Sequence, residues 1–333
     1  MPEMRQDPAT KEWVIIASGR SRRPHRERKL KKRELPPFEP SCPFCPGNEH
    51  LNPKEVLRYP DAETGQGWRV RVVRNKYPAL IPEGSTQRRQ EVEFFTKLDG
   101  VGVHEVIVES PSHNSFIALM EEREVEDILL AYKQRYSELS REPTVKLIII
   151  FKNRGERAGT SLVHPHAQLV ATPVVPADIR RRLEVAIAHY DGTSQSLYQD
   201  IVDHELKVGE RIVMDTERFV VFHPFASRSP FETWIVPKRQ QACFGNVPTD
   251  DLRDLAHVLR TTLLKLYRLL DDPDFNYVIR SCPVGDENKL YYLWHICIIP
   301  RLTQIAGFEI GSGIFINTAL PEETAASMRK LKV

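Results

Sequence analysis

The sequence predicts an α+β protein made of two similar halves, each with antiparallel strands and one long helix. Two observations support this expectation. Segments that read as strands and helices follow one another in the same order twice after residue 100. In each pass a strand that carries a histidine comes about sixty residues after the first strand. A repeated order of elements indicates a duplicated unit, so we expect two domains, residues 1–175 and 176–333.

Three segments precede the repeat. The apolar run at 12–17 predicts an opening strand, and a basic, proline-containing stretch continues from it to about residue 40. A turn-rich segment follows at 41–48. Residues 68–73 alternate apolar and polar side chains, which is the period-two pattern of a half-buried strand.

The repeat itself supplies the strands and the long helix of each half. In the first pass we expect strand 104–109, helix 121–140, strand 145–151 and a histidine-bearing strand at 164–171. In the second pass we expect strand 231–236, helix 249–270, strand 275–279 and strand 293–300. The glycine-rich tail at 306–317 predicts a strand or turn, and 321–331 predicts a final short helix.

Length, charge and cysteine content exclude several classes of protein. The chain has 333 residues and a formal net charge of +2, whereas nucleic-acid-binding domains are usually strongly basic. The apolar runs are shorter than the ~20 residues of a membrane-spanning helix, and residues 1–8 lack the apolar core of a secretory signal. Five cysteines without such a signal do not indicate a disulfide framework. We therefore expect a cytoplasmic protein that binds neither membrane nor nucleic acid.

Basic residues nevertheless crowd the stretch from Arg20 to Arg33. Such a run is most often a solvated loop or arm, and otherwise an anion-binding site. The residues alone leave both alternatives open.

The strongest chemical signal is a row of polar side chains on the expected strand at 164–171. His164 and His166 are two residues apart, so both should point to one face, and Gln168 extends the row. Just upstream, the loop at 153–161 offers glycines and hydroxyls that can bind a phosphate. A neutral imidazole is a good nucleophile at phosphorus, which favours His166 as the nucleophile of a nucleotidyl transfer. By spacing alone, an exposed polar strand or a pair of metal ligands remains equally open.

Cys42 and Cys45 form a Cys-x-x-Cys motif beside turn-forming prolines and a glycine. This spacing suits a tetrahedral zinc ion. A redox pair or two buried thiols would give the same spacing, so the motif alone does not decide among these alternatives.

Ordered motifs run along nearly the whole chain. They are Asp7-Pro8, Glu12-Trp13-Val14, 20–24, 42–48, 73–78, 104–113, 153–168, Pro224-Phe225-Ala226, 230–238, Trp294-His295, Pro300-Arg301 and Gly307-Phe308-Glu309. As a set they resemble the galactose-1-phosphate uridylyltransferase family, a branch of the histidine-triad superfamily. The resemblance implies a duplicated histidine-triad-like fold, in which the first half carries zinc and nucleophile and the second half has a degenerate site that contributes substrate contacts.

The resemblance also implies the reaction. His166 would attack the α-phosphorus of UDP-glucose, form a covalent uridylyl-histidine and release glucose 1-phosphate. Galactose 1-phosphate would then take the uridylyl group and leave as UDP-galactose. The main-chain carbonyl of His164 would orient the other ring nitrogen of His166. Ser161 and Gln168 would bind the phosphates, and Gln168 would stabilise the covalent intermediate.

Further substrate contacts follow from the same resemblance. Asn75, Asn153 and Gly159 match residues that contact the nucleotide, and Phe308 and Glu309 are expected to contact substrate. Arg20 and Arg23 match arginines that reach the nucleotide of the partner subunit, which implies a homodimer. The remaining basic residues, 26–33, then read as a solvated loop.

The family places its other metal ligands at the positions of His113 and His164. Together with Cys42 and Cys45 they would form a closed Cys2His2 zinc site, which would hold the nucleophile strand in position rather than activate water. His104 lies nearby but is expected to be structural.

Some family members bind a second metal in the C-terminal half. The matching positions here are Arg182, Arg280, His295 and Cys297. Two arginines would repel a cation, so we expect no second metal and a structural His295. Cys243, Cys282 and Cys297 are expected to be buried, inert thiols.

Two alternative functions remain. The first is a nucleotide-sugar phosphorylase, often specific for adenine as in ADP-glucose, in which phosphate discharges the nucleotidyl-histidine. The tail at 308–313 resembles plant enzymes of this kind, and the sugar-contact positions Thr303, Gln304 and Phe315 depart from the best-known transferases. The second is a zinc-stabilised nucleic-acid-binding protein, which would leave residues 153–168 without a purpose.

Overall fold

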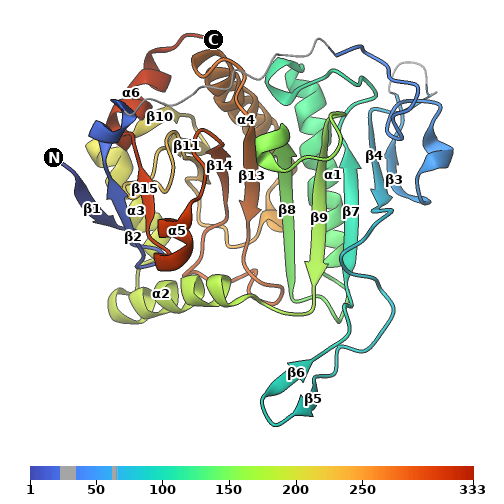
Figure 1. The fold of residues 1–333 in the computed structure, drawn as a ribbon, viewed down its shortest axis with the longest axis horizontal. Helices are drawn as coiled ribbons and strands as arrows, with labels where there is room; N and C mark the ends of the chain where they lie inside the picture. Colours follow the sequence, from blue (N-terminus) through green and yellow to red (C-terminus); the bar gives the residue numbers. More distant parts are fainter. Residues whose placement is uncertain (23–34, 62–64, 66) are drawn as a thin grey trace.

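A single ten-stranded antiparallel sheet runs through the protein (Figure 1). The computed structural model describes residues 1–22, 35–61, 65 and 67–333. The strand order across the sheet is β10-β11-β12-β14-β13-β8-β9-β7-β4-β3. The strands are β3 (Glu55–Tyr59), β4 (Val70–Arg74), β7 (Val103–Val108), β8 (Leu147–Arg154), β9 (His166–Thr172), β10 (Ile212–Asp215), β11 (Phe219–Phe222), β12 (Thr233–Pro237), β13 (Phe275–Arg280) and β14 (His295–Pro300).

The strand order confirms the duplicated α+β fold that the repeat predicts. From the central pair β8–β13 outward, each strand of one half has a counterpart in the other: β9 and β14, β7 and β12, β4 and β11, β3 and β10. The central pair is itself antiparallel, with Asn153 opposite Asn276. Because one sheet passes through both halves, the division into domains at residue 175 stays a prediction.

Two long helices cover one face of this sheet, as the sequence predicts. They are α1 (Glu122–Leu139) and α4 (Thr249–Leu269), and they pack against each other. In α4 the buried residues Leu252, Leu255, Leu259, Leu263 and Leu266 recur every three or four positions, which places them on one side of the helix. At the start of α1 a reciprocal capping box between residues 121 and 124 satisfies backbone N–H groups that have no helical partner.

Two helices that the sequence analysis does not predict cover part of the second half. They are α2 (Ala177–Thr193) and α3 (Leu197–Val208). The ring of Tyr198, on α3, lies 5.6 Å from the ring of His295 at the start of β14. The opposite face of the sheet is therefore covered at β14.

The two ends of the chain meet in a small separate sheet. Its order is β1 (Glu3–Gln6), β2 (Trp13–Ile16) and β15 (Phe315–Asn317), with β15 parallel to β2. The predicted strand or turn at 306–317 is thus partly wrong, because α5 (Gly307–Ser312) occupies its first part and only β15 is a strand. The final helix α6 (Pro321–Lys330) agrees with its prediction. A two-stranded hairpin, β5 (Arg89–Val92) and β6 (Phe95–Lys97), projects from the body (Figure 1).

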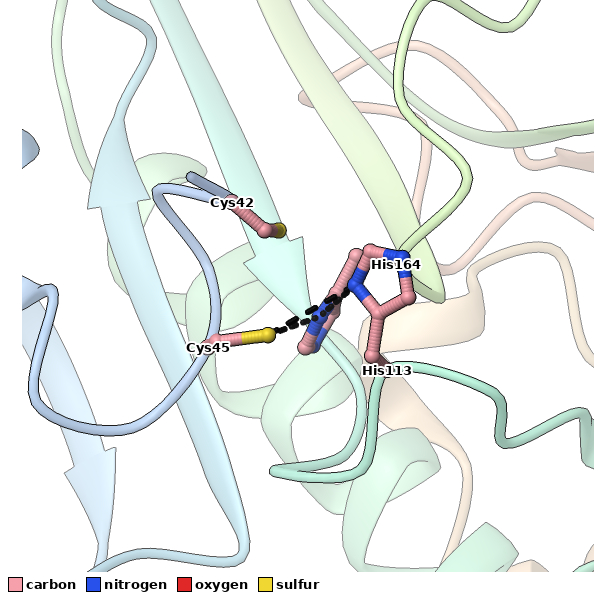
Figure 2. Close-up of side chains that lie close together, drawn as sticks. All are labelled: Cys42, Cys45, His113 and His164. Carbon is pink, nitrogen blue, oxygen red and sulfur yellow. Dashed lines mark hydrogen bonds between the residues drawn. The ribbon is translucent and has the colours of Figure 1, made fainter. Parts of the chain in front are cut away.

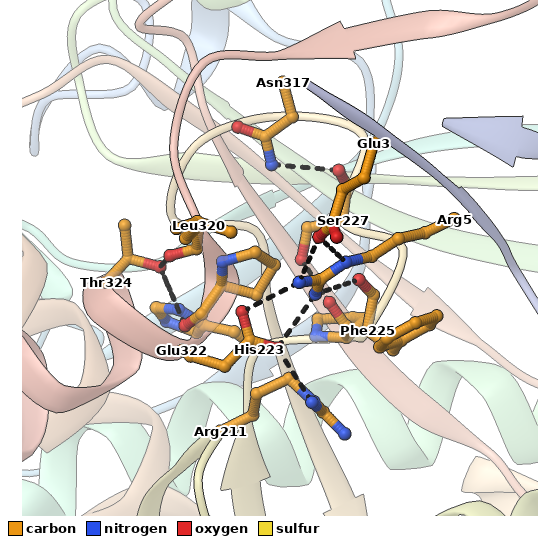
Figure 3. A network of polar contacts seen from close by, with 12 residues as sticks. Glu3, Arg5, Arg211, His223, Phe225, Ser227, Asn317, Leu320, Glu322 and Thr324 are labelled. Carbon is orange, nitrogen blue, oxygen red and sulfur yellow. Dashed lines mark hydrogen bonds and ion pairs between the residues drawn. The ribbon is translucent and has the colours of Figure 1, made fainter. Parts of the chain in front are cut away.

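A buried polar network fastens these chain ends to the second half (Figure 3). Arg5 of β1 donates to the carboxylate of Glu322 on α6 at 2.8 and 3.2 Å, and Arg211 donates to the same group at 2.8 Å. Burial opposes the ionised carboxylate, but the two guanidinium groups hold the pKa of Glu322 below its usual range. The network therefore replaces water around a charge that α6 brings into the protein.

All five cysteines, each within the described residues, are free and buried. None of the helices in the described part of the chain combines the length and the apolar character needed to span a bilayer.

The network contains a histidine that should make stability depend on pH. His223 is fully buried, its Nδ1 lies 2.7 Å from the Thr324 hydroxyl, and burial lowers its pKa to about 3. In the unfolded chain a histidine titrates near pH 6.5. Between those two pH values the unfolded chain binds one more proton than the folded chain, so stability is full above about pH 6.5 and falls as the pH is lowered.

We predict that His223→Gln weakens this pH dependence. Urea unfolding followed by tryptophan fluorescence at pH 7, 6 and 5 should show a slope smaller than that of the wild type by up to about 1.4 kcal/mol per pH unit. The exposed His50→Gln serves as the matched control and should keep the wild-type slope. An unchanged slope in His223→Gln would contradict the assignment.

Candidate active site and metal centre

Four buried side chains form a cluster with the spacing of metal ligands (Figure 2). They are Cys42, Cys45, His113 and His164. The Sγ atom of Cys45 lies 3.5 Å from Nδ1 of His113 and 3.6 Å from Nδ1 of His164, and the two Nδ1 atoms are 3.4 Å apart. A tetrahedral ion with bonds of about 2.0–2.3 Å separates its ligand atoms by about 3.3–3.8 Å. The cluster can therefore hold a small tetrahedral cation with little rearrangement.

Hydrogen bonds outside the cluster aim these ligands inward. His164 Nε2 lies 2.8 Å from the carbonyl oxygen of Ser110, which can only accept, so Nε2 carries the proton and Nδ1 presents a lone pair to the cluster. Burial lowers the pKa of His164 to about 4, which keeps the ring neutral near pH 7. Asn48 Nδ2 donates to the carbonyl of Cys42 at 2.8 Å and shapes the turn that holds both cysteines.

The structure corrects one expectation about the histidine row. His164 does not belong to the strand; β9 begins at His166, and His164 lies in the turn before it. Pro165 explains this start, because proline has no N–H to donate to a strand partner. His164 therefore turns to the metal cluster, while His166 and Gln168 share one face of β9 as expected.

His166 is held as a neutral ring with one free nitrogen. Its Nδ1 lies 2.8 Å from the carbonyl oxygen of His164, so Nδ1 carries the proton and Nε2 keeps its lone pair. Burial lowers the pKa of His166, which favours this neutral form. The ring of Phe44, from the cysteine turn, lies 5.5 Å from the ring of His166. A neutral imidazole with a directed lone pair can act as a nucleophile.

A buried charged network, which was not predicted from the sequence, contacts the first residue of β9. Lys152 Nζ donates to the carbonyl of His166 at 3.0 Å and forms an ion pair with Glu109. Glu109 also accepts from the hydroxyl of Tyr132 at 2.6 Å, which lies 2.7 Å from the hydroxyl of Tyr277 in the second half. The one signal in the sequence was a lysine in the apolar run of β8.

The predicted phosphate loop follows β8 and is anchored to the second half. Gly155 has φ +87°, and a Cβ there would lie 1.8 Å from Oδ1 of Asp274, so only glycine fits. Asp274 in turn accepts from the backbone N–H of Arg157 at 2.8 Å. Gly159 is left-handed with open space around it, and Ser161 is exposed. The loop can therefore present backbone N–H groups and a hydroxyl to an anion.

Three predicted substrate contacts have side-chain partners that the sequence did not reveal. Gln168 Oε1 lies 2.8 Å from Nε2 of His104, and Asn75 Nδ2 lies 3.1 Å from the same nitrogen. Asn153 Oδ1 accepts from Asn276 Nδ2 at 2.8 Å. His104, which was expected to be only structural, is thus in direct contact with a predicted site residue.

Other predicted residues lie elsewhere in the same chain. Phe308 and Glu309 are exposed or half-buried on α5, which lies beside β15 and away from β9 (Figure 1). Arg20 follows β2 in that same region, where its N–H donates to the carbonyl of Ala17. Arg23 and the basic residues 26–33 lie outside the described residues.

The second half contains a fully buried counterpart of His166. His295 begins β14 as His166 begins β9, and its Nδ1 lies 3.2 Å from the carbonyl oxygen of Leu293, again two residues before it. His295 is 0% exposed, compared with 9% for His166, and it stacks on Trp234 at 4.4 Å. Burial and the charge of Arg280 lower its pKa well below the usual value. The expectation that this half binds no metal stays a prediction.

Comparisons with known proteins identify relatives of this chain. Residues 1–176 match the family of the galactose-1-phosphate uridyl transferase N-terminal domain. The whole chain is 35% identical to an ADP-glucose phosphorylase of Arabidopsis thaliana and covers 93% of it. It is also 30% identical to a galactose-1-phosphate uridylyltransferase of Thermotoga maritima and covers 99% of that protein.

Two solved structures resemble this chain over nearly its whole length. A crystal structure of an ADP-glucose phosphorylase from Arabidopsis thaliana with bound ADP-glucose matches with a TM-score of 0.86 and 33% identity, over 100% of this chain and 99% of the other. A uridylyltransferase structure matches with a TM-score of 0.76 and 27% identity, over 99% and 97% of the two chains.

We predict that Lys152→Met destabilises the protein by about 3–5 kcal/mol, because it leaves the carboxylate of Glu109 buried without its partner. Chemical unfolding measures this loss. The exposed Lys146→Met, just before the same strand, is the matched control and should change stability by less than about 0.5 kcal/mol. Equal stability of the two variants would show that the ion pair between Lys152 and Glu109 does not stabilise the protein.

Proposed function

The chain belongs to the galactose-1-phosphate uridylyltransferase family, and on that premise we propose that it transfers a nucleoside monophosphate through a covalent bond to His166. One observation carries the proposal: the His164 carbonyl binds Nδ1 of His166, so the lone pair of the neutral ring is on Nε2. A nucleophile in a fixed orientation loses little entropy when it reacts. The chain is in any case a nucleotidyltransferase-type enzyme, since that activity is common to the family.

The proposed reaction has two steps. In the first, Nε2 of His166 attacks the α-phosphorus of a nucleotide sugar, an N–P bond forms, and the P–O bond to the sugar phosphate breaks. The leaving group is a hexose 1-phosphate. In the second, a phosphate oxygen of the acceptor attacks the same phosphorus and the N–P bond breaks. Gln168, Ser161 and the loop N–H groups are proposed to stabilise the phosphate oxygens, with Asn75, Asn153 and Gly159 on the nucleotide.

Our first candidate reaction is the exchange of UDP-glucose and galactose 1-phosphate for UDP-galactose and glucose 1-phosphate. It is supported by the family match and by the full-length similarity to the Thermotoga maritima transferase. The second candidate is phosphorolysis of a nucleotide sugar such as ADP-glucose. It is favoured by one observation, the higher similarity in sequence and in structure to the Arabidopsis thaliana phosphorylase.

We propose zinc as the ion of the Cys42 cluster. Two thiolates and two neutral imidazoles at tetrahedral spacing are the donor set of structural zinc sites. Four protein ligands leave no position for water. The ion would therefore fix the turn that carries His164, whose carbonyl orients His166.

We also propose a homodimer in which Arg20 and Arg23 reach the active site of the partner subunit. Within one chain Arg20 follows β2, and β2 belongs to the small sheet of the chain ends, which lies away from β9 (Figure 1). A second copy of the chain would supply the cations that the developing phosphate charge requires. Phe308 and Glu309 are proposed as further substrate contacts.

We predict that labelled UDP-glucose or ADP-glucose, added without an acceptor, labels His166 and releases one hexose 1-phosphate per active site. His166→Ala should retain nucleotide binding but lose labelling, and its turnover should fall at least about 10⁴-fold. His257→Ala, at an exposed histidine on α4, is the matched control and should label normally. Normal turnover by His166→Ala would refute the proposed nucleophile.

The acceptor is then identified by discharging the labelled protein. Release of the label by galactose 1-phosphate as UDP-galactose supports the first candidate. Release only by inorganic phosphate, as a nucleoside diphosphate, supports the second. The nucleotide sugar that labels faster identifies the base.

We further predict that Cys42→Ser lowers zinc content and melting temperature together, because serine is a poor zinc ligand. Bound metal is measured by mass spectrometry of the purified protein. Cys297→Ser is the matched control, since Cys297 is a buried thiol outside the cluster, and it should keep full zinc content. Unchanged zinc content and melting in Cys42→Ser would show that the metal is bound elsewhere.

A further inference from the structure

Two side-chain amides in the site have their oxygens occupied by protein donors. They belong to Gln168 on β9 and Asn153 on β8. The partners, His104 and Asn276, come from the strands on either side, β7 and β13. An amide whose oxygen is bound in this way can still offer the hydrogens of its N–H2 group to a ligand.

The polarity of the first pair is fixed by the backbone. The N–H of Ala79 can only donate, and it lies 3.1 Å from Nδ1 of His104. Nδ1 is therefore the acceptor, and Nε2 of the neutral ring must carry the hydrogen. That hydrogen can bind only an acceptor, so the atom 2.8 Å away must be the oxygen of Gln168, not its nitrogen.

The polarity of the second pair is fixed in the same way. The carbonyl of Ala158 can only accept, and it lies 2.9 Å from Nδ2 of Asn276. The nitrogen of Asn276 is thus identified, and the atom of Asn153 that it also approaches, at 2.8 Å, must be the oxygen. If either amide group rotated by half a turn, its N–H2 group would face another hydrogen-bond donor.

A third amide competes for the same nitrogen of His104. Asn75 Oδ1 accepts from the backbone N–H of Tyr77 at 2.8 Å, so its N–H2 group faces Nε2 of His104 at 3.1 Å. Nε2 cannot both donate to Gln168 and accept from Asn75. The contact between Ala79 and Nδ1 and the shorter distance of 2.8 Å to Gln168 both favour the bond to Gln168.

The sheet decides where the two N–H2 groups point. The oxygen of Gln168 faces outward to β7, and the oxygen of Asn153 faces outward to β13. In a carboxamide the nitrogen and the oxygen diverge from the same carbon, so each N–H2 group points away from the donor that holds its oxygen. Neither N–H2 group is therefore turned toward its partner on β7 or β13, and both belong to the pair β8–β9, in which β9 begins at His166.

We propose that His104 and Asn276 are positioning residues that lock the amides of Gln168 and Asn153 so that their N–H2 groups, and not their oxygens, face the bound nucleotide sugar, with Gln168 at the reacting phosphate. An anionic phosphate needs donors, and preorganised donors stabilise its developing charge without reorganisation. An amide free to turn would present its oxygen part of the time and repel the phosphate. The proposal rests on the proposed function, because it assumes that phosphate is transferred at His166.

The test measures the single-turnover rate of His166 labelling with UDP-glucose or ADP-glucose, whichever labels the wild type. His104→Phe removes the donor, and Asn276→Asp presents only oxygens to the Asn153 oxygen. Each should slow labelling about 10- to 100-fold, the effect of a lost hydrogen bond to a charged group. His104→Gln, which restores an N–H near the position of Nε2, should recover most of the rate.

A double-mutant cycle separates positioning from a general structural role. If His104 acts through Gln168, then His104→Phe should cause no further loss in a Gln168→Ala background. Asn276→Asp should likewise cause no further loss in Asn153→Ala. Multiplicative losses in the double variants, or full-rate labelling by both single variants, would overturn the proposal. Since the cycle compares folded variants with one another, melting temperatures are measured for all of them.

The behaviour of the wild type distinguishes a failure of the proposed function from a failure of the positioning role. Failure of the wild type to label with either nucleotide sugar contradicts the proposed function itself. Normal labelling of the wild type together with unaffected variants contradicts only the positioning role.

Discussion

The site depends on one hydrogen bond, from Nδ1 of His166 to the main-chain carbonyl of His164. It links His164, a member of the Cys42 cluster, to the proposed nucleophile two residues later, so that whatever holds His164 also orients His166. The other cluster residues and the carbonyl of Ser110 contact the ring of His164. Lys152 donates a hydrogen bond to the carbonyl of His166. The buried charges are tolerated there because each has a partner. Small displacements of the turn would redirect the ring, so the proposed metal would influence turnover through the position of His164 alone.

The duplication shows what distinguishes an active site from its copy. Both halves begin the same strand with a histidine bonded to the carbonyl two residues before it. In the second half α3 and Trp234 enclose that histidine completely, and Arg280 adds a charge that disfavours protonation. The copy instead supports the first half. Tyr277 contacts Tyr132 on α1, while Asp274 and Asn276 bind the loop after β8 and the end of β8 itself. The shared central pair β8–β13 makes this possible.

The sequence predicted the fold because periodic segments repeat in order, and the structure agrees in α1, α4 and the central strands to within a few residues. It did not predict α2 and α3, whose positions depend on the surface they cover. It also placed His164 on the strand, since alternation alone cannot show that Pro165 delays the ladder until His166. Residues brought together from distant strands, such as Glu109, Lys152, His104 and Asn276, form no local pattern. Their roles became visible only when the sheet order was known.

The most direct test is a crystal structure of the protein after reaction with its nucleotide sugar in the absence of an acceptor. We expect a phosphorus atom bonded to Nε2 of His166, with Nδ1 still within hydrogen-bonding distance of the His164 carbonyl. A phosphorus on Nδ1, on another side chain, or bound on the helix-covered face of the sheet would contradict it.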